Sequence, residues 1–127
     1  MNIQKQMTEL FGNSCYAYCI AYLYGKKRTI YELTEAVLGG WKAGYISNGG
    51  YVSAPHLFAN FCIGKKGFYT DVIQKPYKPT NYEQIVCWEY GHKTHFVVMK
   101  DGQIVFDPWP NSETVRLGNP VSVREYI

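Results

Sequence analysis

Residues 94–109 read THFVVMKDGQIVFDPW, with two runs of β-branched and aromatic residues on either side of Asp101 and Gly102. Such runs around an Asp-Gly pair predict a β-hairpin. The first strand of this hairpin would carry His95 near its start, and the second would carry Asp107 at its end. Both polar residues would then lie at the open end of the hairpin.

The length of the turn decides whether His95 and Asp107 share a face of the hairpin. With Asp101 and Gly102 as a two-residue type I′ loop, Asp107 points to the side opposite His95. With Lys100 added to make a three-residue loop, closed by Gly102 in the left-handed conformation, His95 lies directly opposite Asp107. We favour the three-residue loop, which predicts that the two side chains meet.

Sequence before the hairpin is helical in pattern. Three segments have apolar residues at helical spacing and end at glycine: 15–23 before Gly25, 29–38 before Gly39 and Gly40, and 55–62 before Gly64. Asn13 or Ser14 can cap the first helix, and Thr29 with Glu32 has the spacing of a capping box. Pro55 suits the first turn of the third helix.

After residue 67 the pattern changes to that of strands. Four segments are rich in β-branched and aromatic residues: 68–73, 85–90, 95–99 and 103–107. The strongest break in the pattern is QKPYKPTN at 74–81, where two prolines interrupt it. Helices followed by an antiparallel sheet predict the α+β class.

Length and composition indicate one compact domain spanning residues 1–127. Hydrophobic residues make up 46% and charged residues 18%, which is unlike a disordered chain. The net charge is +3 and the longest basic run is KKR at 26–28, so we expect no nucleic-acid partner. No segment reaches membrane-spanning length, and the N-terminus lacks the apolar run of a secretory signal. We therefore expect a cytoplasmic protein, or one encoded by a phage or plasmid.

A cysteine at the start of the first helix points to nucleophilic chemistry. The sulfur of Cys15 would face the unpaired N–H groups and the positive end of the helix dipole, which favour thiolate over thiol. Such a nucleophile needs a base, and the base needs a third group that fixes its orientation. His95 and Asp107 are the candidates for these two roles.

Four stretches together carry a resemblance to a known family: GNSCYAYCIAYLYG, TIYELTEAV, GGYVSAPHLFANFCIGK and THFVVMKDGQIVFDPW. They resemble the papain-like cysteine peptidases related to the bacteriocin leader-processing (double-glycine) peptidase domains. The resemblance implies an N-terminal helical lobe packed on a C-terminal antiparallel sheet. It also implies a hydrolase that cleaves a peptide or amide bond, with Cys15 as nucleophile, His95 as base and Asp107 as orienting acid.

Two residues differ from the pattern of that family. The family has a glutamine that stabilises the oxyanion about six residues before its cysteine, where this chain has Glu9, and Gln6 lies three residues further back. An ionised carboxylate cannot donate a hydrogen bond, so Gln6 is our candidate donor, together with the N–H of Cys15. Tyr16 replaces the glycine that follows the cysteine in the family and can narrow the cleft. Trp109, held between two prolines, can form a wall of that cleft.

The sequence leaves other functions open. One is a peptidoglycan amidase or endopeptidase with the same chemistry, and another is a non-catalytic binding module, which Glu9 and Tyr16 favour. A zinc site is a third alternative, with ligands from two short pairs: Cys15 and Cys19, and His92 and His95. Five aromatic residues can line a groove for a peptide or glycan, although such residues are usually core: Tyr16, Tyr45, Tyr51, Trp88 and Trp109.

The chain has three cysteines besides Cys15. Cys19, Cys62 and Cys87 lie in apolar patterns and are expected to be buried, reduced core residues. No motif for a cofactor is evident, so we expect none.

Overall fold

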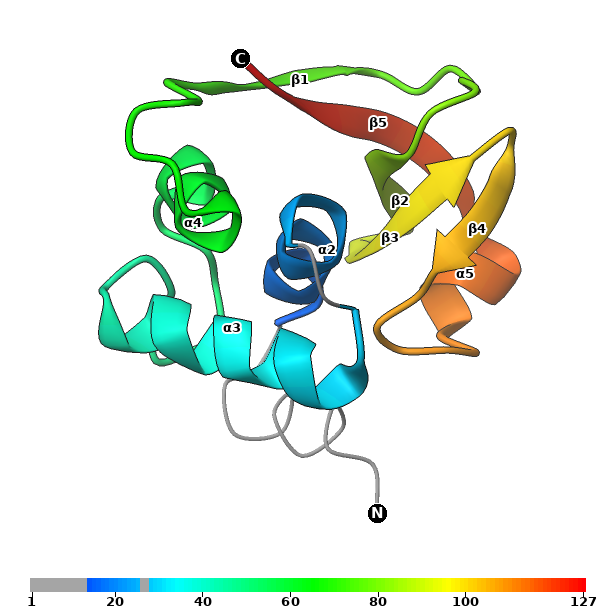
Figure 1. The fold of residues 1–127 in the computed structure, drawn as a ribbon. Coiled ribbons are helices and arrows are strands. Elements are labelled where there is room, and N and C mark those ends of the chain that lie inside the picture. The colour runs from blue at the N-terminus through cyan, green and yellow to red at the C-terminus, as the bar shows by residue number, and fades with distance from the viewer. Residues whose placement is uncertain (1–13, 26–27) are drawn as a thin grey trace.

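The computed structural model describes residues 14–25 and 28–127 (Figure 1). The described residues form an α+β fold with helices α2 (Cys15–Tyr24), α3 (Ile30–Lys42), α4 (Pro55–Ile63) and α5 (Glu113–Leu117). The strands are β1 (Val72–Pro76), β2 (Gln84–Tyr90), β3 (Lys93–Lys100), β4 (Gln103–Phe106) and β5 (Asn119–Tyr126). They form one antiparallel sheet in the order β1-β5-β2-β3-β4. The prediction of the α+β class with an antiparallel sheet is therefore confirmed.

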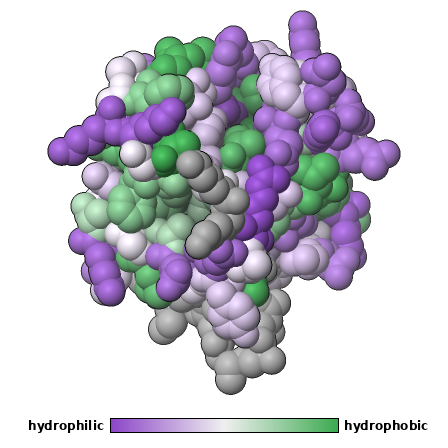
Figure 2. Space-filling model, in the orientation of Figure 1, coloured by the Kyte–Doolittle hydropathy of each residue, from purple (hydrophilic) through white to green (hydrophobic). Residues whose placement is uncertain are grey.

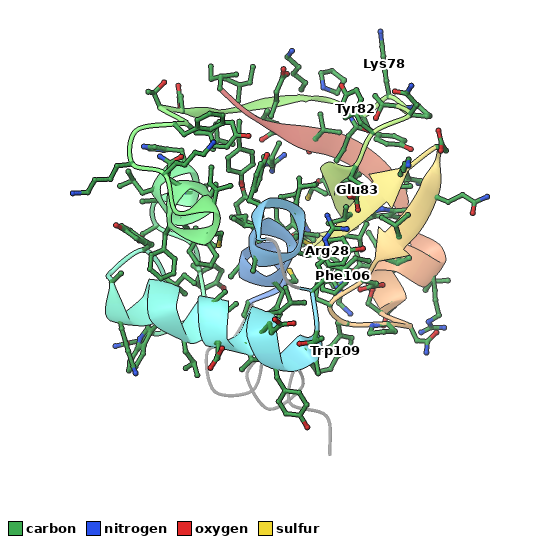
Figure 3. The ribbon with its side chains drawn as sticks, viewed as in Figure 1. Arg28, Lys78, Tyr82, Glu83, Phe106 and Trp109 are labelled. Carbon is green, nitrogen blue, oxygen red and sulfur yellow. The ribbon has the colours of Figure 1, made fainter. Side chains whose placement is uncertain are left out.

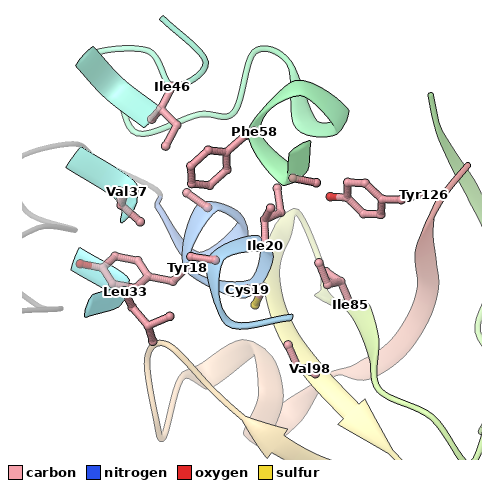
Figure 4. Close-up of a cluster of buried hydrophobic side chains, with 13 residues drawn as sticks. Tyr18, Cys19, Ile20, Leu33, Val37, Ile46, Phe58, Ile85, Val98 and Tyr126 are labelled. Atoms are coloured by element: carbon pink, nitrogen blue, oxygen red, sulfur yellow. The ribbon is translucent and has the colours of Figure 1, made fainter. Parts of the chain in front are cut away.

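Helix α2 lies at the centre of the protein, between the sheet and the other two N-terminal helices (Figures 1 and 4). Its residues Tyr18 and Ile20 are almost fully buried, as are Phe58 of α4 and Val98 of β3. Burying a side chain of this size stabilises a fold by roughly 1.5–3 kcal/mol. A smaller cluster, around Val97, covers the opposite face of the sheet, where α5 packs. The central position of α2 therefore holds its N-terminal residue, Cys15, firmly against the sheet.

The local signals predicted the starts of two helices correctly. Thr29 and Glu32 form the predicted capping box at the start of α3, and Pro55 occupies the first turn of α4. Ser14 is the N-cap residue of α2, but its side chain makes no capping hydrogen bond, so that part of the prediction is wrong. Asn13 lies outside the described residues.

Helix α3 does not end at Gly39 and Gly40, as predicted, but continues to Lys42. These two glycines do not end the helix; they allow α3 and α4 to pack closely. A Cβ atom on Gly40 would lie 2.5 Å from Cε1 of Phe58, and one on Gly39 would lie 2.9 Å from Cζ of Phe61. The missing side chains therefore let α3 approach α4 closely, and this packing outweighs the low helix propensity of glycine.

The first strand begins later than predicted, at Val72 instead of residue 68. The side chain of Asn60 holds the backbone of Tyr69 away from the sheet, because it donates to the Tyr69 carbonyl (2.9 Å) and accepts from the Tyr69 N–H (2.8 Å). The strand then extends into the proline-rich break and ends at Pro76. A proline is tolerated there because β1 is an edge strand.

The hairpin of β3 and β4 turns through two residues, so the predicted three-residue loop is wrong. Lys100 pairs with Gln103, and both Asp101 and Gly102 have positive φ, at 54° and 75°. The register then shifts, because Ile104 and Phe106 pair with adjacent residues of β3 and Val105 forms a bulge. That extra residue moves Asp107 to the side of the hairpin that His95 occupies. The predicted meeting of the two side chains is confirmed, although the bulge achieves it and the loop does not.

The surface facing the reader mixes hydrophilic and hydrophobic side chains (Figure 2). An ion pair on the surface joins Arg28, before α3, to Glu83, before β2, at 3.0 Å (Figure 3).

Within residues 14–25 and 28–127, none of the helices is both long and apolar enough to cross a membrane.

Candidate active site

Cys15 is the first residue of α2 and is only 7% exposed. The next side chain along the helix places this end of α2 against the sheet, since the ring of Tyr16 stacks on Phe96 with centroids 4.5 Å apart. Phe96 directly follows His95 in β3, and the side chain of Cys15 is close enough to that of His95 to help raise its pKa. The fold thus joins two residues that are far apart in the chain.

The imidazole ring of His95 is hydrogen-bonded to Asp107. Its Nε2 atom lies 2.7 Å from Oδ1 of Asp107, and the two side chains are only 8% and 14% exposed. The same carboxylate oxygen accepts the backbone N–H of Trp109 at 2.9 Å. Because that second bond fixes the carboxylate, Asp107 can hold the imidazole ring in one orientation.

The surroundings of His95 favour its protonated form. Burial by itself would lower its pKa, but the hydrogen bonds to Asp107 and Cys15, and the charges of these groups, raise the pKa to about 9. An ordinary histidine titrates near pH 6.5. His95 therefore carries a proton at neutral pH, directly between a sulfur and a carboxylate.

The remaining predicted site residues differ in where they lie. Gln6 and Glu9 lie outside the described residues. Tyr16 is half-buried, and burial raises its pKa to about 12. The hydrogen bond between its hydroxyl and that of Tyr126, at 2.6 Å, acts in the opposite direction. Trp109 is half-buried and bonded to Asp107 through its backbone.

The other thiols are part of the core, as predicted. All four cysteines are among the described residues, and no disulfide joins them there. Cys19 is fully buried and Cys87 nearly so, while Cys62 is partly buried. Burial raises the pKa of each of these three thiols, well above the ordinary value for Cys19 and to about 12 for Cys62. They are poor nucleophiles in the folded protein.

The zinc alternative gains no support from the geometry. Among the described residues, no group of three or more His, Cys, Asp or Glu side chains is arranged to hold a metal ion. His92 lies exposed at the turn between β2 and β3, whereas Cys19 is in the core. The two predicted ligand pairs therefore do not converge.

Two cavities flank α2. The larger, about 600 Å³, lies at the C-terminal end of the helix beside Tyr24, away from Cys15. The smaller, about 440 Å³, is lined by Tyr16 and is therefore the one next to the candidate nucleophile. Of the five aromatic residues considered for a groove, Tyr16 lines the smaller cavity and the other four line neither of these two. The smaller cavity is the better candidate for a substrate pocket, because Tyr16 in its wall follows Cys15 in the chain.

The sequence analysis missed strand β5, which contributes Arg124 and Tyr126 to the neighbourhood of Tyr16. Its signal was present in the sequence, because VSVR at 121–124 alternates apolar and polar residues with the period of a strand. Helix α5, also missed, has only five residues, but Ser112 caps it by accepting the N–H of Val115.

No family model matches the chain, and comparisons with curated proteins and with solved structures give no significant match.

Proposed function

We propose that this protein is a cysteine-dependent hydrolase of the papain-like kind, which cleaves a peptide or amide bond through a thioester intermediate. The observation that carries the proposal is that His95 is hydrogen-bonded to Asp107 and interacts with the side chain of Cys15. A nucleophile, a base and an orienting acid in this order are what acyl transfer to water requires.

Acylation begins with the Cys15 thiolate, which the neighbouring imidazolium stabilises. The sulfur attacks the carbonyl carbon of the substrate, and the electron pair of the C=O bond moves onto oxygen. When the carbonyl forms again, the C–N bond breaks and His95 gives its proton to the leaving nitrogen. Because Asp107 occupies Nε2, we assign this proton to Nδ1 of His95. The products are a free amine and a thioester on Cys15.

Deacylation reverses the roles of these groups. His95, now neutral, takes a proton from a water molecule, and the oxygen of that water attacks the thioester carbon. The C–S bond breaks and the carboxylic acid leaves, which restores the thiolate and the imidazolium. Asp107 stays ionised throughout and stabilises the charged ring each time it forms.

Selective alkylation tests this assignment. At pH 7 we expect iodoacetamide to modify Cys15 first, because burial raises the pKa of the other three thiols. Intact-mass spectrometry should show one fast addition that is absent in Cys15→Ala and at least about tenfold slower in His95→Ala. Cys62→Ala is the matched control, since it removes a thiol outside the site and should leave the fast addition unchanged.

The burial of Cys15 favours one rival, a non-catalytic module that keeps the fold for binding. This rival predicts that Cys15 reacts no faster than Cys62. An amidase or endopeptidase acting on peptidoglycan would share the reactive thiol and would differ in substrate, so binding to purified cell-wall polymer separates it from a peptidase.

A further inference from the structure

The smaller cavity is lined by the residue that follows the candidate nucleophile in α2. It begins at Tyr16, the residue after Cys15, and its walls come from residues 53–56 at the start of α4, from residues 71–74 at the start of β1, and from Arg124 of β5. A substrate whose reactive carbonyl reaches Cys15 would place a neighbouring side chain close to this cavity. The residues that line it are therefore placed to select the substrate.

Arg124 is the cation of this cavity that lacks a charged partner. Three other basic residues of the described chain form ion pairs: Arg28 with Glu83, Lys75 with Glu125, and Lys93 with Glu113. Among the ion pairs of the described residues, none involves Arg124. Its guanidinium donates to Ser122 Oγ at 2.9 Å and lies 5.2 Å from the ring centroid of Phe96. Arg124 is thus held in position while its charge remains available.

Contacts also place this cation near the start of α2. The ring of Phe96 contacts both Arg124 and Tyr16, the residue that follows Cys15. The buried sulfur of Cys87 interacts electrostatically with both Arg124 and Cys15. Arg124 is therefore only a few side chains from the sulfur that would attack the substrate.

The one carboxylate in the cavity wall does not cancel this charge. Asp71 is exposed, and its Oδ1 accepts the N–H of Val72 at 2.8 Å. Arg124 is half-buried, so water screens its field less than that of Asp71. His56 also lines the cavity and offers a further hydrogen-bond donor.

From these observations we infer that the cavity is a specificity subsite for a carboxylate side chain of the substrate, with Arg124 as the residue that recognises it. Guanidinium and carboxylate groups match in geometry and can form two parallel hydrogen bonds. The inference rests on the proposed function and adds a substrate class to it: peptides or amides with an acidic residue next to the bond that is cleaved.

Two electrophiles that differ only in charge test the inference. The bromoacetyl derivatives of glutamic acid α-amide and of glutamine α-amide carry the same reactive carbon and nearly the same side-chain shape. Their rates of Cys15 alkylation, followed by intact mass, give a ratio that is independent of the intrinsic reactivity of the sulfur. We expect the acidic probe to react about fivefold to tenfold faster, as one charge-assisted hydrogen bond would produce.

Variants then assign the preference to Arg124. Arg124→Gln should bring the ratio close to one, whereas Arg124→Lys should keep part of the preference. Asp71→Asn should raise the ratio because it removes the opposing charge. Lys78→Gln is the matched control: it removes one positive charge from a side chain that projects outward (Figure 3) and lines only the larger cavity, so the ratio should stay as in the parent.

The outcomes separate the two proposals. If Cys15 reacts with iodoacetamide but the ratio is near one in the parent, or is unchanged in folded Arg124→Gln, the subsite is wrong and the hydrolase proposal stands. If Cys15 is inert to iodoacetamide, the hydrolase proposal itself fails. Should Arg124→Gln not fold, Asp71→Asn decides, because a ratio that does not rise in this variant contradicts an electrostatic subsite.

Discussion

Replacing Asp107 by asparagine should destabilise the protein in a way that depends on pH. The carboxylate accepts from Nε2 of His95 at 2.7 Å, and both side chains are at least 86% shielded from water. Hydrogen bonds to charged groups contribute about 1.5–3 kcal/mol. We therefore expect Asp107→Asn to lower the free energy of unfolding by about 2 kcal/mol at pH 6, where His95 is protonated.

The direction of the pH dependence follows from the pKa of His95. In the folded protein this pKa is about 9, because the hydrogen bonds to Asp107 and Cys15 outweigh the opposite effect of burial. A pKa that is higher in the folded than in the unfolded state stabilises the fold fully below about pH 6.5, and this contribution disappears as the pH rises through 9. The stability difference between the parent and Asp107→Asn should therefore be largest at pH 6 and smaller at pH 10.

Urea denaturation of both proteins between pH 6 and 10 measures this difference. Other titrating groups affect parent and variant alike and cancel. Glu83→Gln is the control, because it breaks the exposed ion pair with Arg28 and should lower stability by less than about 1 kcal/mol, with no change between pH 6 and 9. Parallel stability curves for the parent and Asp107→Asn over the whole range would refute the coupling of His95 to Asp107.

Two further predictions concern packing and register. Gly40→Ala should lower the free energy of unfolding by about 1–3 kcal/mol in urea, because the new Cβ would lie 2.5 Å from the fully buried ring of Phe58, and this overpacking exceeds the gain in helix propensity. Deleting Val105 removes the bulge but leaves Asp107 opposite the same residue of β3, so the pH-dependent stability should remain; deleting Ile104 as well should turn Asp107 to the other side and abolish it. Loss of the pH dependence in the single deletion would contradict the assigned register.

The helices show how far local signals reach. The start of α3 at Thr29 and of α4 at Pro55 could be predicted, because a cap or a proline acts within one turn of the chain. The end of α3 could not, since Gly39 and Gly40 resemble a helix stop in sequence and are used for contact with α4. Whether a glycine ends a helix or allows close packing depends on what lies against it.

The candidate site, too, could be predicted from the sequence only in part. A cysteine at a helix start, a histidine in a strand and an aspartate before a proline could be selected from the sequence alone, because each of these positions is defined by its neighbours in the chain. The sequence of the turn predicted a loop of three residues, whereas the loop has two. The bulge at Val105, which brings Asp107 to the same side as His95, is not visible in the residue pattern. Strand β5 has a local signal, but the sequence does not show that it pairs with β1 and β2, which places Arg124 beside Tyr16.

The sequence by itself therefore determined the fold class, the starts of two helices and the choice of three candidate site residues. Only the tertiary structure decided that His95 is hydrogen-bonded to Asp107 and interacts with Cys15, and that Arg124, which has no ion-pair partner among the described residues, lines a cavity with Tyr16. The physical reason is that capping and periodicity act between near neighbours in the chain, whereas the packing of α2 on the sheet and the pairing of β5 join residues that the chain itself keeps far apart.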